Sequence, residues 1–128
     1  MKYYSTNHKA PLASLHEAVV RGLAPDRGLY MPERINRLPQ EFFDNIDKLS
    51  FQEIAYNVAQ AFFGEDVEPE ALKKIVYDTL AFDCPIVEVE PNIYSLELFH
   101  GPTLAFKDVG ARFMARLLQY FIRQEGKE

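Results

Sequence analysis

The chain has 128 residues, of which 48% are hydrophobic and 13% aromatic, and this composition excludes a disordered protein. Its 14 lysines and arginines stand against 19 aspartates and glutamates, so the net charge is −5, and no block of basic residues is present. Nucleic acid and anionic lipid are therefore not expected as partners, and a small soluble ligand is favoured.

The cysteine content and the lengths of the apolar runs indicate the cellular compartment of the protein. Cys84 is the single cysteine, so no internal disulfide forms, and no cluster of cysteine and histidine has the spacing of a zinc site. No run approaches the roughly 20 apolar residues that span a bilayer, and the first residues lack an apolar signal core. We expect a cytoplasmic protein with no metal site and no membrane segment.

The first third of the sequence predicts two short extended segments around a helix. Residues 1–6 contain an aromatic pair that is typical of an edge strand. Ser14 and Glu17 have the spacing of a capping box, so a helix is expected to begin there and to end at Gly22. Residues 29–31 precede a proline and are expected to be extended.

Two longer helices are predicted in the middle of the chain. Ser50 and Glu53 form a second capping box, apolar residues then recur at helical spacing, and Gly64 is a stop signal. Pro69 suits the first turn of the next helix, whose apolar face continues toward Phe82. We expect these amphipathic helices to cover one another and the strands that follow.

The last third of the chain changes from helical spacing to alternation and back. Residues 86–89 and 93–99 alternate between apolar and polar side chains, and a tight turn at residues 91–92 joins them, which predicts two strands. Residues 100–103 interrupt the second strand. A final helix is expected over residues 104–124.

These elements predict an α+β fold, with a mainly helical amino-terminal domain and a short β-hairpin. Helix-rich sequence gives way near residues 83–92 to a strand and a helix that resemble the opening of an α/β domain. We place one domain at residues 1–85 and the start of a second at residues 86–128.

Chemistry is visible at one position, Lys107. Thr103 is a candidate N-cap, which places Lys107 in the first turn of the last helix, on a stripe with Gly110 and Met114. The helix dipole and burial on that apolar stripe both favour a neutral amine, which is the form that attacks an aldehyde. The same spacing is typical of an ordinary helix lysine whose amine reaches water, and spacing alone does not decide between the two.

A family resemblance bears on that choice. The run LELFHGPTLAFKD at residues 96–108 resembles the signature around the cofactor-binding lysine of threonine synthases, which depend on pyridoxal phosphate (PLP). Residues 3–6, 22–26 and 28–33 resemble the amino-terminal part of the same family. Arg27 departs from the pattern, because the family often has glycine there.

The resemblance implies the fold of the tryptophan synthase β family and the conversion of O-phospho-L-homoserine and water into L-threonine and phosphate. Lys107 would form the Schiff base with PLP and would transfer protons on the substrate. Thr103, Phe106 and Asp108 would be neighbours of the substrate or cofactor. His100 is expected to be a hydrogen-bonded structural residue.

The resemblance also implies that the chain is an amino-terminal piece of a longer lyase of threonine biosynthesis. No glycine-rich loop that would hold the cofactor phosphate follows Lys107, so the piece alone is expected to be inactive. The last helix is apolar on more than one side, which predicts self-association through it.

Two alternatives remain at this stage. One is another PLP-dependent lyase of the same fold, such as a threonine dehydratase or a cysteine synthase. The other is a small helical interaction module without catalysis, in which Lys107 is a surface residue.

Overall fold

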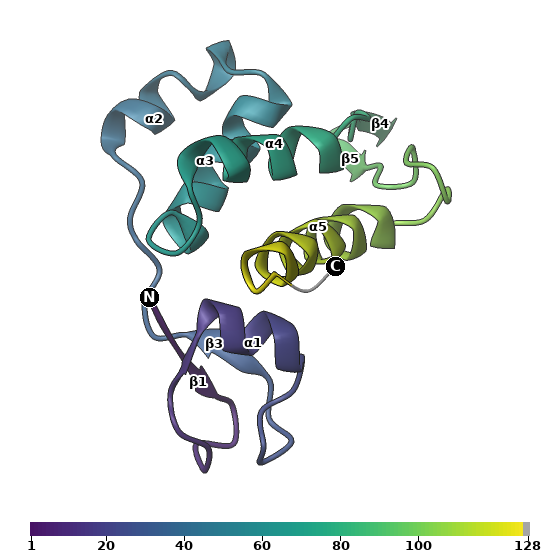
Figure 1. Ribbon diagram of the computed structural model, residues 1–128. Coiled ribbons are helices and arrows are strands. Elements are labelled where there is room, and N and C mark those ends of the chain that lie inside the picture. The colour runs from purple at the N-terminus through teal and green to yellow at the C-terminus, as the bar shows by residue number, and fades with distance from the viewer. Residues whose placement is uncertain (127–128) are drawn as a thin grey trace.

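The computed structural model describes residues 1–126 and contains helices and two small antiparallel sheets (Figure 1). The elements in chain order are β1 Lys2–Ser5, β2 Ala13–Ser14, α1 Leu15–Arg21, β3 Tyr30–Pro32, α2 Gln40–Asp44, the 3-10 helix η1 Ile46–Lys48, α3 Phe51–Phe63, α4 Pro69–Thr79, β4 Ile86–Glu90, β5 Ile93–Leu96 and α5 Lys107–Gln124. The expected α+β class is confirmed.

The amino-terminal sheet has the strand order β2-β1-β3, with both pairings antiparallel. The prediction of an edge strand at residues 1–6 is therefore wrong, since β1 pairs on both sides. Helix α1 follows β2 directly, and the predicted capping box starts it: the Glu17 N–H donates to the Ser14 hydroxyl over 3.2 Å, and the Ser14 N–H donates to the Glu17 carboxylate over 2.8 Å. The helix ends at Gly22, whose φ of 75° is open to glycine without strain.

The second capping box starts α3, with Ser50 and Glu53 in the same reciprocal arrangement, and α3 ends at Gly64. Pro69 is the first residue of α4, where its missing N–H costs no hydrogen bond. All three predictions are confirmed. The short helix α2 and η1 were not predicted, because residues 33–49 show neither a capping box nor a sustained apolar period.

Helix α5 lies between α1 on one side and the α3–α4 pair on the other (Figure 1). Leu72 and Val76 of α4, Leu15 of α1, and Leu117 and Phe121 of α5 are buried and belong to one apolar cluster. The core therefore lies along both sides of α5, where it packs against α1 and against the α3–α4 pair.

The hairpin β4–β5 does not share in this core, and every residue of both strands is exposed. The expectation that the helices cover the hairpin is wrong, since they bury their apolar faces against one another and against the sheet. The second strand also ends earlier than predicted, at Leu96. The Glu97 N–H still donates to the Pro85 carbonyl over 2.9 Å, but Pro85 has no N–H to return, so the ladder stops.

Candidate functional site

Lys107 is the first residue of α5, and its side chain is exposed. The stripe that it was expected to share is present, but Gly110 is exposed and Met114 keeps 47% of its surface open to solvent. The face of α5 that packs into the core carries Leu117 and Phe121 instead. Of the two interpretations that the spacing left open, residues 1–126 show the lysine whose amine reaches water, because nothing in this part of the chain covers its stripe.

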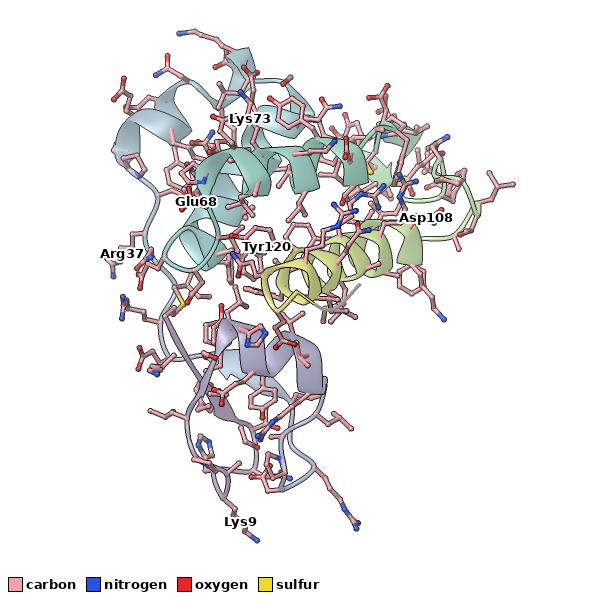
Figure 2. All side chains as sticks on the ribbon, viewed as in Figure 1. Lys9, Arg37, Glu68, Lys73, Asp108 and Tyr120 are labelled. Carbon is pink, nitrogen blue, oxygen red and sulfur yellow. The ribbon has the colours of Figure 1, made fainter. Side chains whose placement is uncertain are left out.

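The loop before Lys107 is held by the carboxylate of Asp108, which lies at the start of α5 (Figure 2). The N–H of Thr103 donates to Asp108 Oδ2 over 2.8 Å, and the Thr103 hydroxyl donates to the same oxygen over 3.0 Å. Asp108 is buried, with 4% of its surface exposed. A carboxylate in the first turn of a helix also interacts favourably with the helix dipole.

Gly101 closes this loop from the other side. It is buried, and a Cβ atom on it would lie 2.6 Å from Asp108 Oδ2 and 2.7 Å from the Asp108 Cβ. The N–H of Leu104 donates back to the Gly101 carbonyl over 3.0 Å. The loop over residues 101–106 thus packs against the Asp108 side chain at a distance that only glycine permits.

The prediction that Thr103 caps the last helix is wrong, and so is its start at residue 104. The residue before the helix is Phe106, and Leu104 has a φ of +56°, which no residue inside a right-handed helix adopts. Thr103 bonds to the side chain of Asp108 and not to a free N–H of the first turn. The loop therefore folds back so that Thr103 contacts Asp108 in the first turn of α5, and the helix begins only at Lys107.

The remaining candidate residues are found close to the loop. Phe106 adjoins Lys107 and is 65% exposed. His100 lies 2.6 Å from a carboxylate oxygen of Glu97 through Nε2, and its ring packs on Phe99. This agrees with the prediction of a hydrogen-bonded structural histidine.

Cys84 is half-buried and unpaired. Burial, with a smaller effect of the Asp83 charge, raises the pKa of its thiol above the ordinary value, so no nucleophile is activated there. Within residues 1–126 no group of three cysteine, histidine or acidic side chains is arranged to hold a metal ion. None of the helices in the described part of the chain is long and apolar enough to cross a bilayer.

Known proteins are similar to this chain along nearly its whole length. The family described as threonine synthase N terminus matches residues 2–80. The chain belongs to that family. Threonine synthase of Escherichia coli strain K12 is 38% identical over 120 residues, a match that covers 94% of this chain and 28% of the relative. Threonine synthase of Saccharomyces cerevisiae is 37% identical, and the match covers 95% of this chain and 26% of the relative.

Solved threonine synthases share the fold. A crystal structure of PLP-bound threonine synthase from Brucella melitensis superposes with a TM-score of 0.91 at 37% identity, covering 98% of this chain and 28% of that one. The Escherichia coli enzyme superposes with a TM-score of 0.87 at 37% identity, and the match covers 94% of this chain and 28% of that enzyme. The family resemblance is confirmed, and it extends past residue 80 to the hairpin, the loop before Lys107 and α5. The chain spans about 28% of the length of the first two relatives of known structure.

Proposed function

We propose that this chain is the amino-terminal region of a threonine synthase, which converts O-phospho-L-homoserine and water into L-threonine and phosphate. The observation that carries the proposal is the 0.91 TM-score to a PLP-bound threonine synthase over 98% of the chain, a span that reaches the loop before Lys107. PLP and the phosphorylated amino acid are the proposed cofactor and substrate of the complete enzyme.

The residues around Lys107 fit a PLP-linked lysine. Its amine is exposed, so an aldehyde can reach it, and the loop before it is fixed by the Thr103 and Gly101 contacts with Asp108. When bound, PLP would supply an electron sink for the removal of a proton from the substrate Cα. In that setting Lys107 holds the cofactor and then moves protons at Cα and Cβ of the substrate.

The neighbouring residues have supporting roles in this proposal. Asp108 is a positioning residue, because its carboxylate is occupied by two hydrogen bonds from Thr103 and is shielded from solvent. Thr103 is engaged in the same contact, and Phe106, exposed beside Lys107, forms part of the wall of the site. We propose direct contact with the substrate or cofactor for Phe106 and a shaping role for the other two.

We propose that the 128-residue chain by itself lacks synthase activity and binds PLP weakly. The glycines after Lys107 are Gly110 and Gly126, and they do not form a glycine-rich phosphate cradle. A domain boundary near residue 85 is supported by the family match, which ends at residue 80. A cytoplasmic location is supported by the single unpaired cysteine.

Self-association through α5 is a further part of the proposal. Met114 on its outer stripe is 47% exposed, and the hairpin presents Ile86 and Val89 at 70% and 64% exposure. Exposed apolar side chains of this kind favour association. Light scattering at increasing concentration tests it, and a monomeric mass throughout would contradict it.

The proposal is tested by borohydride reduction of the complete, PLP-loaded gene product, followed by peptide mass mapping. We expect a pyridoxyl mass on Lys107 and its loss in Lys107→Ala, whereas Lys9→Ala, an exposed lysine far from α5 (Figure 2), keeps the label. Labelling at another lysine, or none, would reject the role of Lys107. A substrate panel then separates a threonine synthase from another PLP-dependent lyase.

A further inference from the structure

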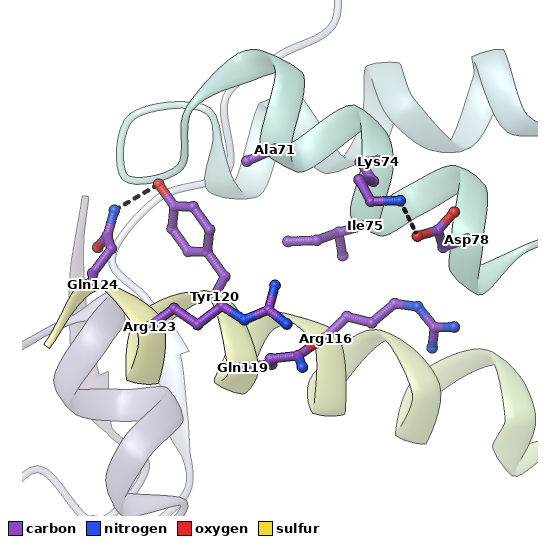
Figure 3. Close-up of a pocket in the computed structure, with 9 residues that line it drawn as sticks. All are labelled: Ala71, Lys74, Ile75, Asp78, Arg116, Gln119, Tyr120, Arg123 and Gln124. Atoms are coloured by element: carbon purple, nitrogen blue, oxygen red, sulfur yellow. Dashed lines mark hydrogen bonds and ion pairs between the residues drawn. The ribbon is translucent and has the colours of Figure 1, made fainter. Parts of the chain in front are cut away.

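A groove lies between α4 and α5 (Figure 3). Arg116 and Arg123 follow Lys107 by nine and sixteen residues, which at 100° per residue places both roughly opposite it around the helix. The groove has a volume of about 360 Å³, which is within the range of pockets that hold small molecules.

The floor of the groove is apolar and fixed in place. Ile75 of α4 is buried, and the ring of Tyr120 packs against the apolar core. The Tyr120 hydroxyl accepts a hydrogen bond from Gln124 Nε2 over 2.8 Å and another from the Glu68 N–H over 3.4 Å. The floor therefore presents one aliphatic and one aromatic surface whose positions are set by packing.

The rim of the groove is cationic, although the chain as a whole is acidic. Lys74, Arg116 and Arg123 are three cations against the single carboxylate of Asp78, which leaves a local charge of +2 where the whole chain carries −5. Lys74 and Asp78 form an ion pair of 2.8 Å. The positive charge of the groove is thus concentrated on the two arginines.

Neither arginine forms an ion pair with an acidic side chain within residues 1–126, although Lys74, through its hydrogen bond and its charge, and then the charge of Arg116 lower the pKa of Asp78. The Arg116 guanidinium donates one hydrogen bond, of 3.3 Å, to the Arg112 carbonyl, and the Arg123 guanidinium has no hydrogen-bond or ion-pair partner in this part of the chain. Arg112, one turn earlier, differs, because it donates to the Asp78 carbonyl over 2.9 Å and packs over the ring of Phe82. Arg112 is thus bound to the Asp78 carbonyl, whereas Arg116 and Arg123, which border the groove, keep guanidinium donors free in the described part of the chain.

We infer that the α4–α5 groove binds a small organic phosphate, with its phosphate between Arg116 and Arg123 and its apolar part on Ile75 and Tyr120. A guanidinium matches the geometry of a phosphate and forms paired, charge-assisted hydrogen bonds with it. The apolar floor adds affinity for an organic group that inorganic phosphate lacks. The inference does not depend on the proposed synthase activity, because it uses only the α4 and α5 side chains.

The test is calorimetric titration of the 128-residue chain with phenyl phosphate, inorganic phosphate and phenol. We expect phenyl phosphate to bind with a dissociation constant roughly tenfold lower than that of inorganic phosphate, and phenol not to bind below roughly 10 mM. Arg116→Gln and Arg123→Gln should each raise the dissociation constant of phenyl phosphate by about tenfold or more.

Arg37→Gln is the matched control, since it removes one positive charge from an exposed arginine in the segment before α2, away from the groove (Figure 2). We expect this variant to bind phenyl phosphate as the unchanged chain does. Equal weakening by Arg37→Gln and Arg123→Gln would overturn the inference, because it would show attraction by net charge alone. Absence of phenyl phosphate binding would overturn it too, as would equal binding of phenol. Circular dichroism melting of each variant shows whether it is folded.

Discussion

The helical layer and the segment from residue 86 to residue 107 differ in the solvent exposure of their apolar side chains. In the first, Leu72 and Val76 of α4 are almost completely shielded from water within the apolar core. In the second, Ile86, Val89 and Phe106 keep 64% or more of their surface open. The residues that stabilise the chain are therefore separate from those that surround Lys107, and changes in the two regions should have different consequences.

The largest expected effect comes from truncating a buried side chain in the helical layer. Leu72→Ala removes a side chain with no exposed surface, and the loss of burial together with the cavity should lower the free energy of unfolding by about 2–5 kcal/mol. Val89→Ala, on the exposed hairpin, should change it by less than about 0.5 kcal/mol. Urea unfolding measures both. Similar losses in the two variants would abolish the contrast between the regions.

The next largest effect is expected where the exposed segment does pack closely, at Gly101. Gly101→Ala places a methyl group against the Asp108 side chain, so the loop must shift and stability should fall by about 1–3 kcal/mol. Gly110→Ala is the matched control, because nothing lies within 4 Å of a Cβ there, and alanine should stabilise α5 by about 1 kcal/mol. Thermal melts compare the two. A neutral Gly101→Ala would mean that the loop is not held as described.

A smaller, stabilising change is expected at Arg27, in the amino-terminal region. Arg27 has a φ of +67°, a conformation that glycine adopts without strain. Arg27→Gly should therefore raise stability by about 0.5–1 kcal/mol. Arg37→Gly, which is not in that conformation, should lower stability. Destabilisation by both variants would indicate that the Arg27 side chain has a role that its backbone does not reveal.

The smallest effect is a pH dependence at the turn between α3 and α4. Hydrogen bonds from Asn36, Arg34 and the amino terminus lower the pKa of Glu65 from 4.5 to about 2. The folded state therefore gains stability from ionised Glu65 above pH 4.5, and this gain is lost as the pH falls toward 2. Unfolding measured from pH 6 to pH 2 should show a shallower decline in Glu65→Gln than in Glu90→Gln, a substitution on the exposed hairpin. Identical declines in the two variants would show that ionisation of Glu65 does not contribute to the pH dependence of stability.

Much of the fold is predictable from local signals, and the errors share one physical cause. Ser14, Ser50 and Pro69 each mark a helix start through contacts within one turn, so no knowledge of the rest of the chain is needed. Thr103 also looks like a cap, but the buried carboxylate of Asp108 takes its hydrogen bonds and moves the helix start to Lys107.

Periodicity finds the apolar stripe of Lys107 but does not say which side of α5 is covered. The helix has apolar residues around much of its circumference, and contacts with α1 and α4 select the side with Leu117 and Phe121. The cationic groove was missed in the same way. The sequence places Arg116 and Arg123 on one side of a helix, yet only the packing of α4 beside it shows that they border a cavity.

The contact between Thr103 and Asp108 also bears on the order of folding events. The two residues are five positions apart, so bringing them together confines very little chain, and such short loops close in well under a microsecond once their ends are attractive. The core contacts of α5 with α1 instead join segments about one hundred residues apart. The loop that precedes Lys107 can therefore acquire its shape as soon as the first turn of α5 exists, before the slower long-range docking of that helix.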